Sequence, residues 1–216
     1  MTNTATNKSA PSISETYEEA SKYFARAGAL DFTLEQLASD LTRKNIDYVV
    51  VGGVALRAHG YNRFTNNINL VVTAEGLQNF VTPMPELVPR TLSGYDPIIG
   101  SNRRVRSVPH GILIEVMITG EYPGDGKPKP VSIPDPSTAS TEINGIRIVT
   151  FEKLIELKLA SGMTAPHRLK DLADVQELIK IRGLGPEFSE QLDPYVREKF
   201  MELYESVRQS PKDERN

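Results

Sequence analysis

The chain has 216 residues, 39% of them hydrophobic, and a net charge of −3, so it can bury one sizeable core and is not built for non-specific nucleic-acid binding. The lack of cysteine excludes disulfides, thiolate metal sites and a cysteine nucleophile. No apolar run is long enough to span a membrane and the polar amino terminus lacks a signal-peptide core, so we expect a soluble cytoplasmic protein with no membrane association.

The amino-terminal part of the chain is expected to be helical behind a disordered tail. Residues 1–14 are small, polar and without periodicity, which predicts disorder. Glu15–Arg26 has the apolar spacing of a helix. A second helix is expected to open with Thr33 as its N-cap and Gln36 at the capping-box position, and to end near Ile46.

The next stretch predicts two strands joined by a glycine turn and a short helix. Tyr48–Val51 and Ile68–Val72 read as buried strands, and Val54–His59 as the helix between them. The turn, Gly52-Gly53, allows the backbone to approach a ligand closely. The first helical turn then offers unpaired backbone N–H groups, which are a natural seat for phosphate.

Two asparagines begin the second of these strands. Asn67 and Asn69 flank Ile68, and successive side chains of a strand point to opposite faces. Both amides are therefore expected on one face, at the mouth of the glycine turn, with Ile68 packed behind.

A helix and an irregular segment are expected to follow. Thr73–Phe80 is predicted to be a short helix capped by Thr73, and Val81–Gly100 is rich in proline and glycine, which predicts little regular structure. Ile112–Ile118 reads as a central strand covered on both faces.

Glu115 is the exception in that apolar strand. A carboxylate there is costly unless it is paired, binds a metal or lies at an open edge. Two interpretations stay open: Glu115 belongs to a metal site, or it pairs with a nearby arginine, Arg63 or Arg104.

A loop and a hairpin are predicted before the carboxy-terminal helices. Glu121–Pro136 is a Gly/Pro loop with a short strand at Val131–Ile133, and its Lys127 and Lys129 could reach an anionic ligand. Glu142–Val149 is predicted to be a hairpin with an Asn-Gly type I′ turn.

Three helices are expected in the remainder. Their ranges are Phe151–Ala160 with Thr150 as N-cap, Arg168–Arg182 closed by Gly183, and Phe188–Val207. Lys158 stands on an apolar face, where a merely solvated lysine is unusual. For Lys170 and Asp174, four residues apart, a plain surface ion pair is the favoured interpretation.

The order of these features resembles that of a known family. Val51-Gly52-Gly53, thirteen intervening residues and Asn67-Ile68-Asn69 are similar to the signature of the nucleotidyltransferase superfamily with the DNA polymerase beta-like fold. The likeness extends to the small prokaryotic proteins grouped with AbiEii-type toxins, through Lys158 and the run Arg168-Leu169-Lys170-Asp171. It covers Asp47–Arg182.

The resemblance implies an α/β (α+β) fold with a mixed sheet, flanking helices and a carboxy-terminal helical portion. Together with the residue patterns, it predicts four parts: a disordered tail (1–14), a core with amino-terminal helices (15–150), packed carboxy-terminal helices (151–208) and a frayed tail (209–216). It places Asn67, Asn69 and Glu115 at the catalytic, metal-binding positions. It places the nucleotide at Gly52, Gly53, Arg63, Thr65, Lys158 and Asp171, with Lys158 on phosphate and Asp171 fixing a basic side chain.

This chain departs from the family at both positions where the signature carries aspartate. The family transfers NMP from an NTP to a hydroxyl with Mg²⁺, which prefers anionic oxygen ligands, and the two asparagines remove two charges. The Mg²⁺ site is therefore expected to be weak or lost, and transfer weak or inactive, either in a naturally degenerate member or in an inactivated variant of an active one.

Three functions remain open. The first is a toxin-like nucleotidyltransferase, acting in its unaltered form on a tRNA, another RNA or a protein acceptor. The second is a pseudoenzyme that binds a nucleoside triphosphate without turnover. The third is an interaction module for a partner such as an antitoxin.

Overall fold

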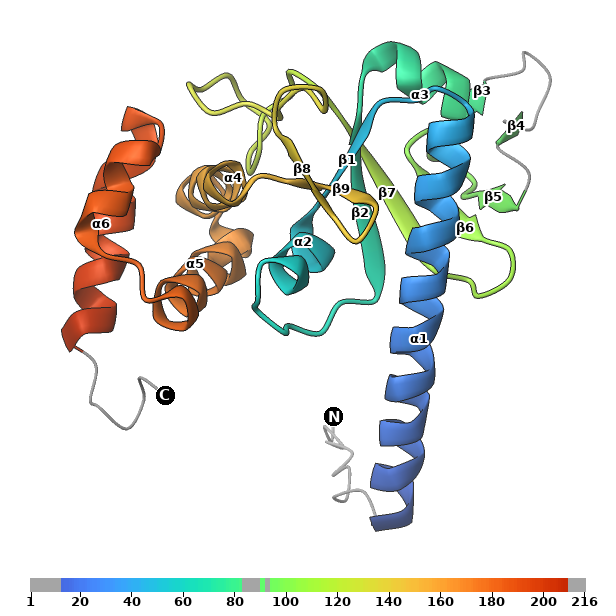
Figure 1. The fold of residues 1–216 in the computed structure, drawn as a ribbon, viewed down its shortest axis with the longest axis horizontal. Coiled ribbons are helices and arrows are strands. Elements are labelled where there is room, and N and C mark those ends of the chain that lie inside the picture. Colours follow the sequence, from blue (N-terminus) through green and yellow to red (C-terminus); the bar gives the residue numbers. More distant parts are fainter. Residues whose placement is uncertain (1–12, 83–89, 92–93, 210–216) are drawn as a thin grey trace, which may run out of the picture.

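The computed structural model describes residues 13–82, 90–91 and 94–209. This part of the chain forms a seven-stranded mixed sheet with flanking helices, which is the α/β class expected from the sequence (Figure 1). The elements are α1 (Ile13–Arg43), β1 (Tyr48–Val51), α2 (Gly52–Ala58), β2 (Asn67–Val72), α3 (Ala74–Phe80), β3 (Val81–Thr82), β4 (Arg90–Thr91), β5 (Tyr95–Pro97), β6 (Arg104–Ser107), β7 (Leu113–Ile118), β8 (Ser140–Ile143), β9 (Ile146–Val149), α4 (Phe151–Thr164), η1 (Pro166–Arg168), α5 (Leu169–Arg182), η2 (Pro186–Gln191) and α6 (Pro194–Gln209).

The sheet has the strand order β5-β6-β7-β2-β1-β9-β8, with β2 at its centre. β2 runs antiparallel to β1 and parallel to β7, and β6 pairs antiparallel with the other edge of β7. The register places Asn69 opposite Glu115 on β7, and Arg104 of β6 opposite the same Glu115. Polar residues of three neighbouring strands therefore form one row across the sheet.

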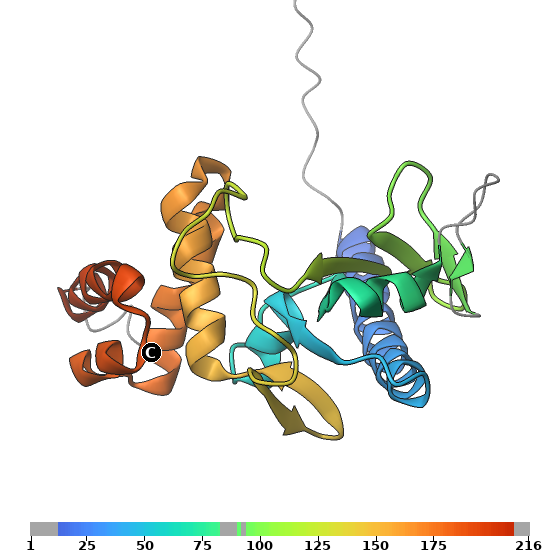
Figure 2. The same ribbon diagram turned by 90° about the horizontal axis from the view of Figure 1, so that it is seen from above.

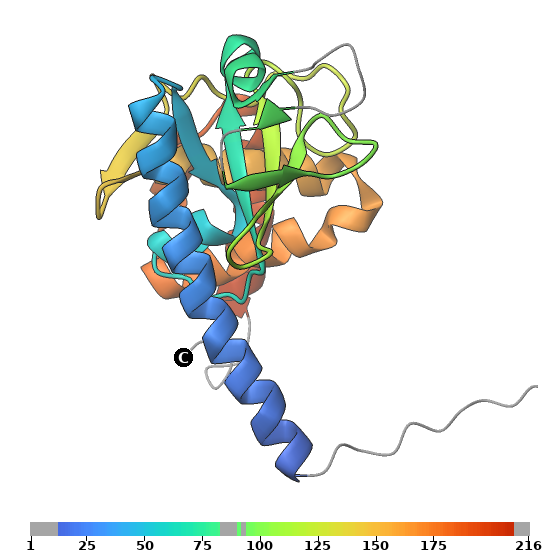
Figure 3. The same ribbon diagram turned by 90° about the vertical axis from the view of Figure 1, so that its right-hand side faces the viewer.

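Helices lie on both sides of this sheet. Figures 1 and 2 show α4, α5 and α6 on one side and α1 on the other. Figure 3 shows the amino-terminal part of α1 extending beyond the sheet. One hydrophobic core joins Leu37 and Leu41 of α1, the strands, and Ile155 and Leu159 of α4. Among the described helices, none combines the length and the apolar content that crossing a membrane requires.

The two amino-terminal helices expected from the sequence are one continuous helix, α1. Leu30 and Leu34 of α1 are buried, and so is Thr33, whose hydroxyl lies 3.5 Å from Ser107 Oγ. The prediction that Thr33 caps a second helix is therefore wrong, because tertiary packing carries the helix through it. Residues 1–12 of the expected disordered tail lie outside the described residues, whereas Ile13 already belongs to α1.

The segment Val81–Gly100, expected to be irregular, contains the strands β3, β4 and β5. Pairing with β6 defines β5, where Tyr95 is buried and its hydroxyl donates to Asp40 Oδ2 at 3.0 Å. Such pairing depends on residues distant in the sequence and overrides local propensity. Conversely, Val131–Ile133 forms no strand, although the backbone of Ile133 bonds with residues 120 and 121.

The last expected helix, Phe188–Val207, is divided into η2 and α6. α6 begins at Pro194, whose fixed φ and missing N–H favour the first position of a helix and disfavour its interior. Residues 210–216 lie outside the described residues, so most of the tail expected to fray is not among them.

Several local predictions are confirmed. Asn144 and Gly145 both have positive φ, 52° and 76°, as a type I′ hairpin turn requires. Gly183 closes α5 in the left-handed region, and Thr73 caps α3 by accepting from Gly76 N at 2.9 Å. Thr150 precedes α4 as expected but makes no side-chain cap.

Candidate functional site

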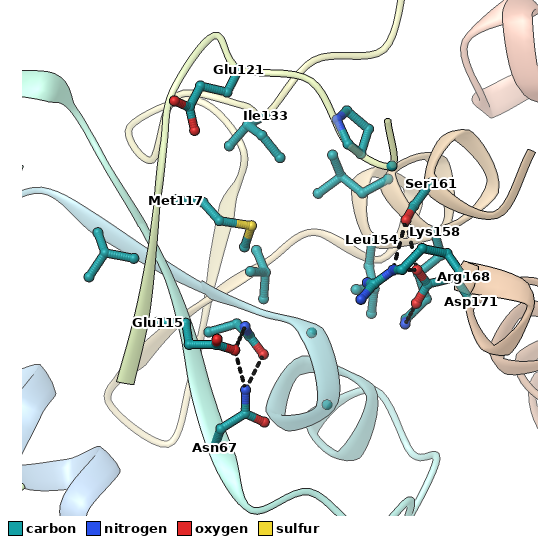
Figure 4. Close-up of a pocket in the computed structure, with 18 of the residues that line it drawn as sticks. Asn67, Glu115, Met117, Glu121, Ile133, Leu154, Lys158, Ser161, Arg168 and Asp171 are labelled. Atoms are coloured by element: carbon teal, nitrogen blue, oxygen red, sulfur yellow. Dashed lines mark hydrogen bonds and ion pairs between the residues drawn. The ribbon is translucent and has the colours of Figure 1, made fainter. Parts of the chain in front are cut away.

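A cleft of about 750 Å³ opens beside the carboxyl end of β1. Its wall combines the turn into α2, strands β2 and β7, the start of β6, the loop after β7, and helices α4 and α5. Figure 4 shows two polar clusters on this wall, with Met117 and other apolar side chains between them in that view. The lining residues used below are Gly52, Gly53, Arg63, Thr65, Asn67, Asn69, Arg103, Arg104, Glu115, Met117, Glu121, Tyr122, Leu154, Leu157, Lys158, Ser161, Arg168, Lys170 and Asp171.

The glycine turn brings backbone close to β2. Gly52 has φ +69°, and a Cβ built on it would lie 2.7 Å from Asn69 Oδ1. A Cβ on Gly53 would lie 2.6 Å from Thr65 Cβ. Only glycine therefore fits both positions, and Thr65 in turn donates to Asn67 Oδ1 at 3.1 Å. The turn thus holds the asparagine pair in place.

Replacing Gly52 by alanine should lower the free energy of unfolding by about 2–3 kcal/mol, because a left-handed φ and a clash with Asn69 combine. Gly183→Ala is the matched control, since Gly183 has a similar φ of 59° and open space around it. That control should cost about 1 kcal/mol. Urea denaturation measures both, and equal costs would mean that the contact with Asn69 is unimportant.

Asn67, Asn69 and Glu115 form the first polar cluster. Asn67 Nδ2 donates to Glu115 Oε2 at 2.7 Å, and Asn69 Nδ2 lies 3.4 Å from the same oxygen. Asn67 Nδ2 is also 3.4 Å from Asn69 Oδ1. The structure thus brings together the three residues that the sequence predicted for one site, and their amides act as donors to the carboxylate.

Arg104 occupies the other side of Glu115. Its Nε and Nη2 both reach Glu115 Oε1, at 3.0 and 2.8 Å. Of the two arginines considered as partners, Arg104 therefore pairs with Glu115, while Arg63 pairs with Asp174. Both oxygens of Glu115 are engaged by donors from the protein.

The family resemblance implies Mg²⁺ at this place, and the residues present do not fit it. Mg²⁺ needs hard, preferably anionic, oxygen ligands in an octahedron. Here a single carboxylate is neutralised by Arg104, and two amides donate to it through nitrogen. Among the described residues, no group of three His, Cys, Asp or Glu side chains could hold a metal ion.

The second polar cluster surrounds Lys158 between α4 and α5. Lys158 Nζ donates to Asp171 Oδ1 at 3.0 Å and to Asp174 Oδ2 at 2.6 Å. Ser161 Oγ and Arg168 Nε both donate to Asp171 Oδ2 at 2.8 Å. Asp171 therefore fixes two basic side chains, Lys158 and Arg168, at the edge of the cleft.

Charge compensation governs this buried cluster. Burial alone would raise the pKa of Asp171, but the adjacent Lys158 ammonium and the hydrogen bond from Ser161 hold the pKa of that carboxyl below its usual value. The interpretation of Lys170 and Asp174 as a surface pair is wrong, because Asp174 is 2% exposed and binds Lys158 and Arg63 instead. Lys158 itself is only 7% exposed, so its contact with a phosphate stays a prediction.

Sequence reasoning considered Arg104 only as a possible partner of Glu115, and it assigned no site role to Ser161 or Arg168. One signal was present, since Ser161 follows Lys158 by three residues and so shares its face of α4. By contrast, Lys129 does not line the cleft, and its ammonium donates to Asp125 Oδ1 at 2.6 Å; its reach to an anionic ligand stays a prediction without support from this cleft.

The cleft is basic although the chain is acidic. Six basic side chains line it, against three acidic ones. The whole chain carries a charge of −3, so the positive charge is concentrated at this site. Two of the arginines, Arg104 and Arg168, are half exposed, at 53% and 51% of the side chain. An anionic ligand is therefore favoured by the local field.

No family model matches the chain, and neither does any curated protein sequence. Among solved structures, the chain is similar to a candidate nucleotidyltransferase from H. pylori, at 15% identity over 87% of this chain and 93% of that chain, with a TM-score of 0.45. The antibiotic-resistance factor ANT(2'')-Ia matches at 15% identity over 83% and 96%, with a TM-score of 0.45. A candidate nucleotidyltransferase from Thermotoga maritima matches at 16% identity over 72% and 92%, with a TM-score of 0.37. Because these TM-scores lie below 0.5, the similarities identify neither a substrate nor a reaction for this chain. What the cleft can bind follows from the residues that line it.

Proposed function

We propose that the cleft binds a nucleoside triphosphate, on a nucleotidyltransferase-like scaffold whose metal site has lost two carboxylates. The observation that carries this proposal is the convergence of the glycine turn, the asparagine pair, Glu115 and the basic side chains on one cleft. In its unaltered form, with aspartate at residues 67 and 69, such a site transfers NMP from an NTP to a hydroxyl of RNA or protein. A toxin-like role, with a tRNA or protein acceptor and an antitoxin partner, belongs to the same proposal.

The composition of the cleft suits a nucleotide. A volume of about 750 Å³ falls in the range of small-molecule sites. Arg168 and Lys170 offer charge for phosphates, whereas Met117, Leu154 and Tyr122 provide apolar surface of the kind on which a base can pack. A ligand with an anionic end and a flat apolar end therefore matches both kinds of lining.

Binding without efficient turnover is the state that we propose for this chain. Transfer of a phosphoryl or nucleotidyl group depends mainly on positioning and on stabilising charge. Asparagine at 67 and 69 preserves the shape of the strand but withholds two of the three negative charges that a metal requires. We expect NMP transfer to be slower than in the family by orders of magnitude, and nucleotide binding to persist.

Isothermal titration with ATP, GTP, CTP and UTP tests the proposal. At least one of them should bind, and Arg168→Gln should weaken that binding about tenfold, because a charged contact at the rim of the cleft is lost. Arg208→Gln is the matched control: Arg208 has a similar exposure of 64%, lies on α6 and does not line the cleft. A chain that binds none of the four nucleotides would refute the proposal and favour an interaction module.

A further inference from the structure

Three strands place a carboxylate and a guanidinium side by side at the centre of the first polar cluster. The register aligns Asn69, Glu115 and Arg104 in one row across β2, β7 and β6. Arg104 reaches one oxygen of Glu115 through two of its nitrogens, and the two amides face the other oxygen. The carboxylate thus has a complete set of partners supplied by the protein.

Arg104 retains donors for a further ligand. A guanidinium has five N–H groups. The N–H of Nε and one N–H of Nη2 donate to Glu115 Oε1. Its Nη1 has no hydrogen-bond partner in the part of the chain that the structure describes. The side chain is 53% exposed and lines the cleft, so these donors are accessible to a ligand there.

The charge balance of the row differs from that of a metal site. A divalent ion would have to displace Arg104 from Glu115 and bind a single carboxylate, which is a poor ligand set for Mg²⁺. An arginine already provides positive charge at the same point, and its planar fork matches the oxygens of a phosphate.

The geometry points to Arg104 as a built-in cation that takes the place of the metal ion and binds the triphosphate directly. This inference rests on the proposed nucleotide binding and specifies it: the ligand is a metal-free triphosphate, held by Arg104 while Glu115 and the two amides orient the guanidinium. Arg104 is thereby a binding residue, and Glu115, Asn67 and Asn69 are positioning residues.

Titration of inorganic triphosphate in EDTA isolates this contact from the base and the sugar. The wild-type protein should bind, Arg104→Gln should bind at least about tenfold more weakly, and Arg104→Lys should lie between them, because lysine keeps the charge but not the fork. Arg106→Gln is the matched control. Arg106 is an exposed arginine on the same face of β6 as Arg104, but it does not line the cleft. The Arg106→Gln variant should therefore bind triphosphate as the wild type does.

The outcomes distinguish a failure of the inference about Arg104 from a failure of the proposed nucleotide binding. If the wild type binds nucleotide but Arg104→Gln binds triphosphate equally well, the inference fails and nucleotide binding stands. Binding of triphosphate that appears only when Mg²⁺ is added would also overturn it. If the wild type binds neither nucleotide nor triphosphate under any condition, the proposed function fails. Thermal melting of each variant verifies that Arg104→Gln and Arg106→Gln remain folded, and Arg104→Lys supplies the comparison if Arg104→Gln does not.

Discussion

Lys158→Met is expected to lower the free energy of unfolding at neutral pH by about 3 kcal/mol or more. The ammonium lies between two carboxylates, Asp171 and Asp174, that are 7% and 2% exposed. Without it, both buried charges lose their shared partner, and Arg63 and Arg168 compensate them only in part. Urea denaturation measures the loss.

Two comparisons sharpen this experiment. Lys170→Met removes an exposed lysine of the same cleft and should change stability by no more than about 0.5 kcal/mol.

The cost of Lys158→Met should also shrink in acid. In the wild type, the lowered pKa of Asp171 stabilises the fold above the ordinary pKa of aspartate, and this contribution disappears as the pH falls. In the variant, the buried carboxyl can take up a proton instead. A cost below about 1 kcal/mol at neutral pH would show that the cluster is not a buried charge network.

The double variant Asn67→Asp with Asn69→Asp should convert the first cluster into an ion site. Both hydrogen bonds to Glu115 Oε2 would be lost and three carboxylates would face one another, so we expect the metal-free variant to be about 2 kcal/mol less stable than the wild type. Mg²⁺ or Mn²⁺ should reverse this loss, because a ligand that binds only the folded state stabilises it by about 2.7 kcal/mol at a hundredfold excess over its Kd. Melting temperature measured against metal concentration tests both effects.

Asn144→Asp is the control for this pair. It makes the same chemical change in the β8–β9 turn, where aspartate tolerates the positive φ. Its melting temperature should respond to Mg²⁺ no more than that of the wild type. If the double variant also shows no metal response, residues 67 and 69 do not have the geometry of an ion site.

The sequence was sufficient for those parts of the site that local geometry determines. The alternation of Asn67, Ile68 and Asn69 predicted that both amides share one face, and the structure places them 3.4 Å apart. The pair Gly52-Gly53 predicted a turn that admits close approach of the backbone; the structure shows such an approach to the side chains of Asn69 and Thr65, whereas approach to a ligand stays a prediction. The shared face follows from neighbouring residues alone, whereas the partners of the glycine pair are set by the pairing of β1 with β2.

Contacts between distant strands and helices could not be read from the sequence. The choice of Arg104 as partner of Glu115 depends on the register of β6 against β7, which local patterns do not determine. In the same way, the spacing of Asp171 and Asp174 predicts a shared face of α5, but only the packing of α4 against α5 places Lys158 between them. The pairing of Arg104 with Glu115 and the place of Lys158 between two carboxylates are therefore results of tertiary structure.

The effect of Mg²⁺ on nucleotide affinity tests most directly whether Arg104 replaces the metal. The measurement is isothermal titration of the wild type with the best-binding nucleoside triphosphate, in EDTA and in Mg²⁺ at matched ionic strength. We predict binding in EDTA that is equal or stronger, because Mg²⁺ partly neutralises the triphosphate that Arg104 would bind. An affinity at least about tenfold higher in Mg²⁺ than in EDTA would contradict this account and would show that nucleotide binding depends on the metal.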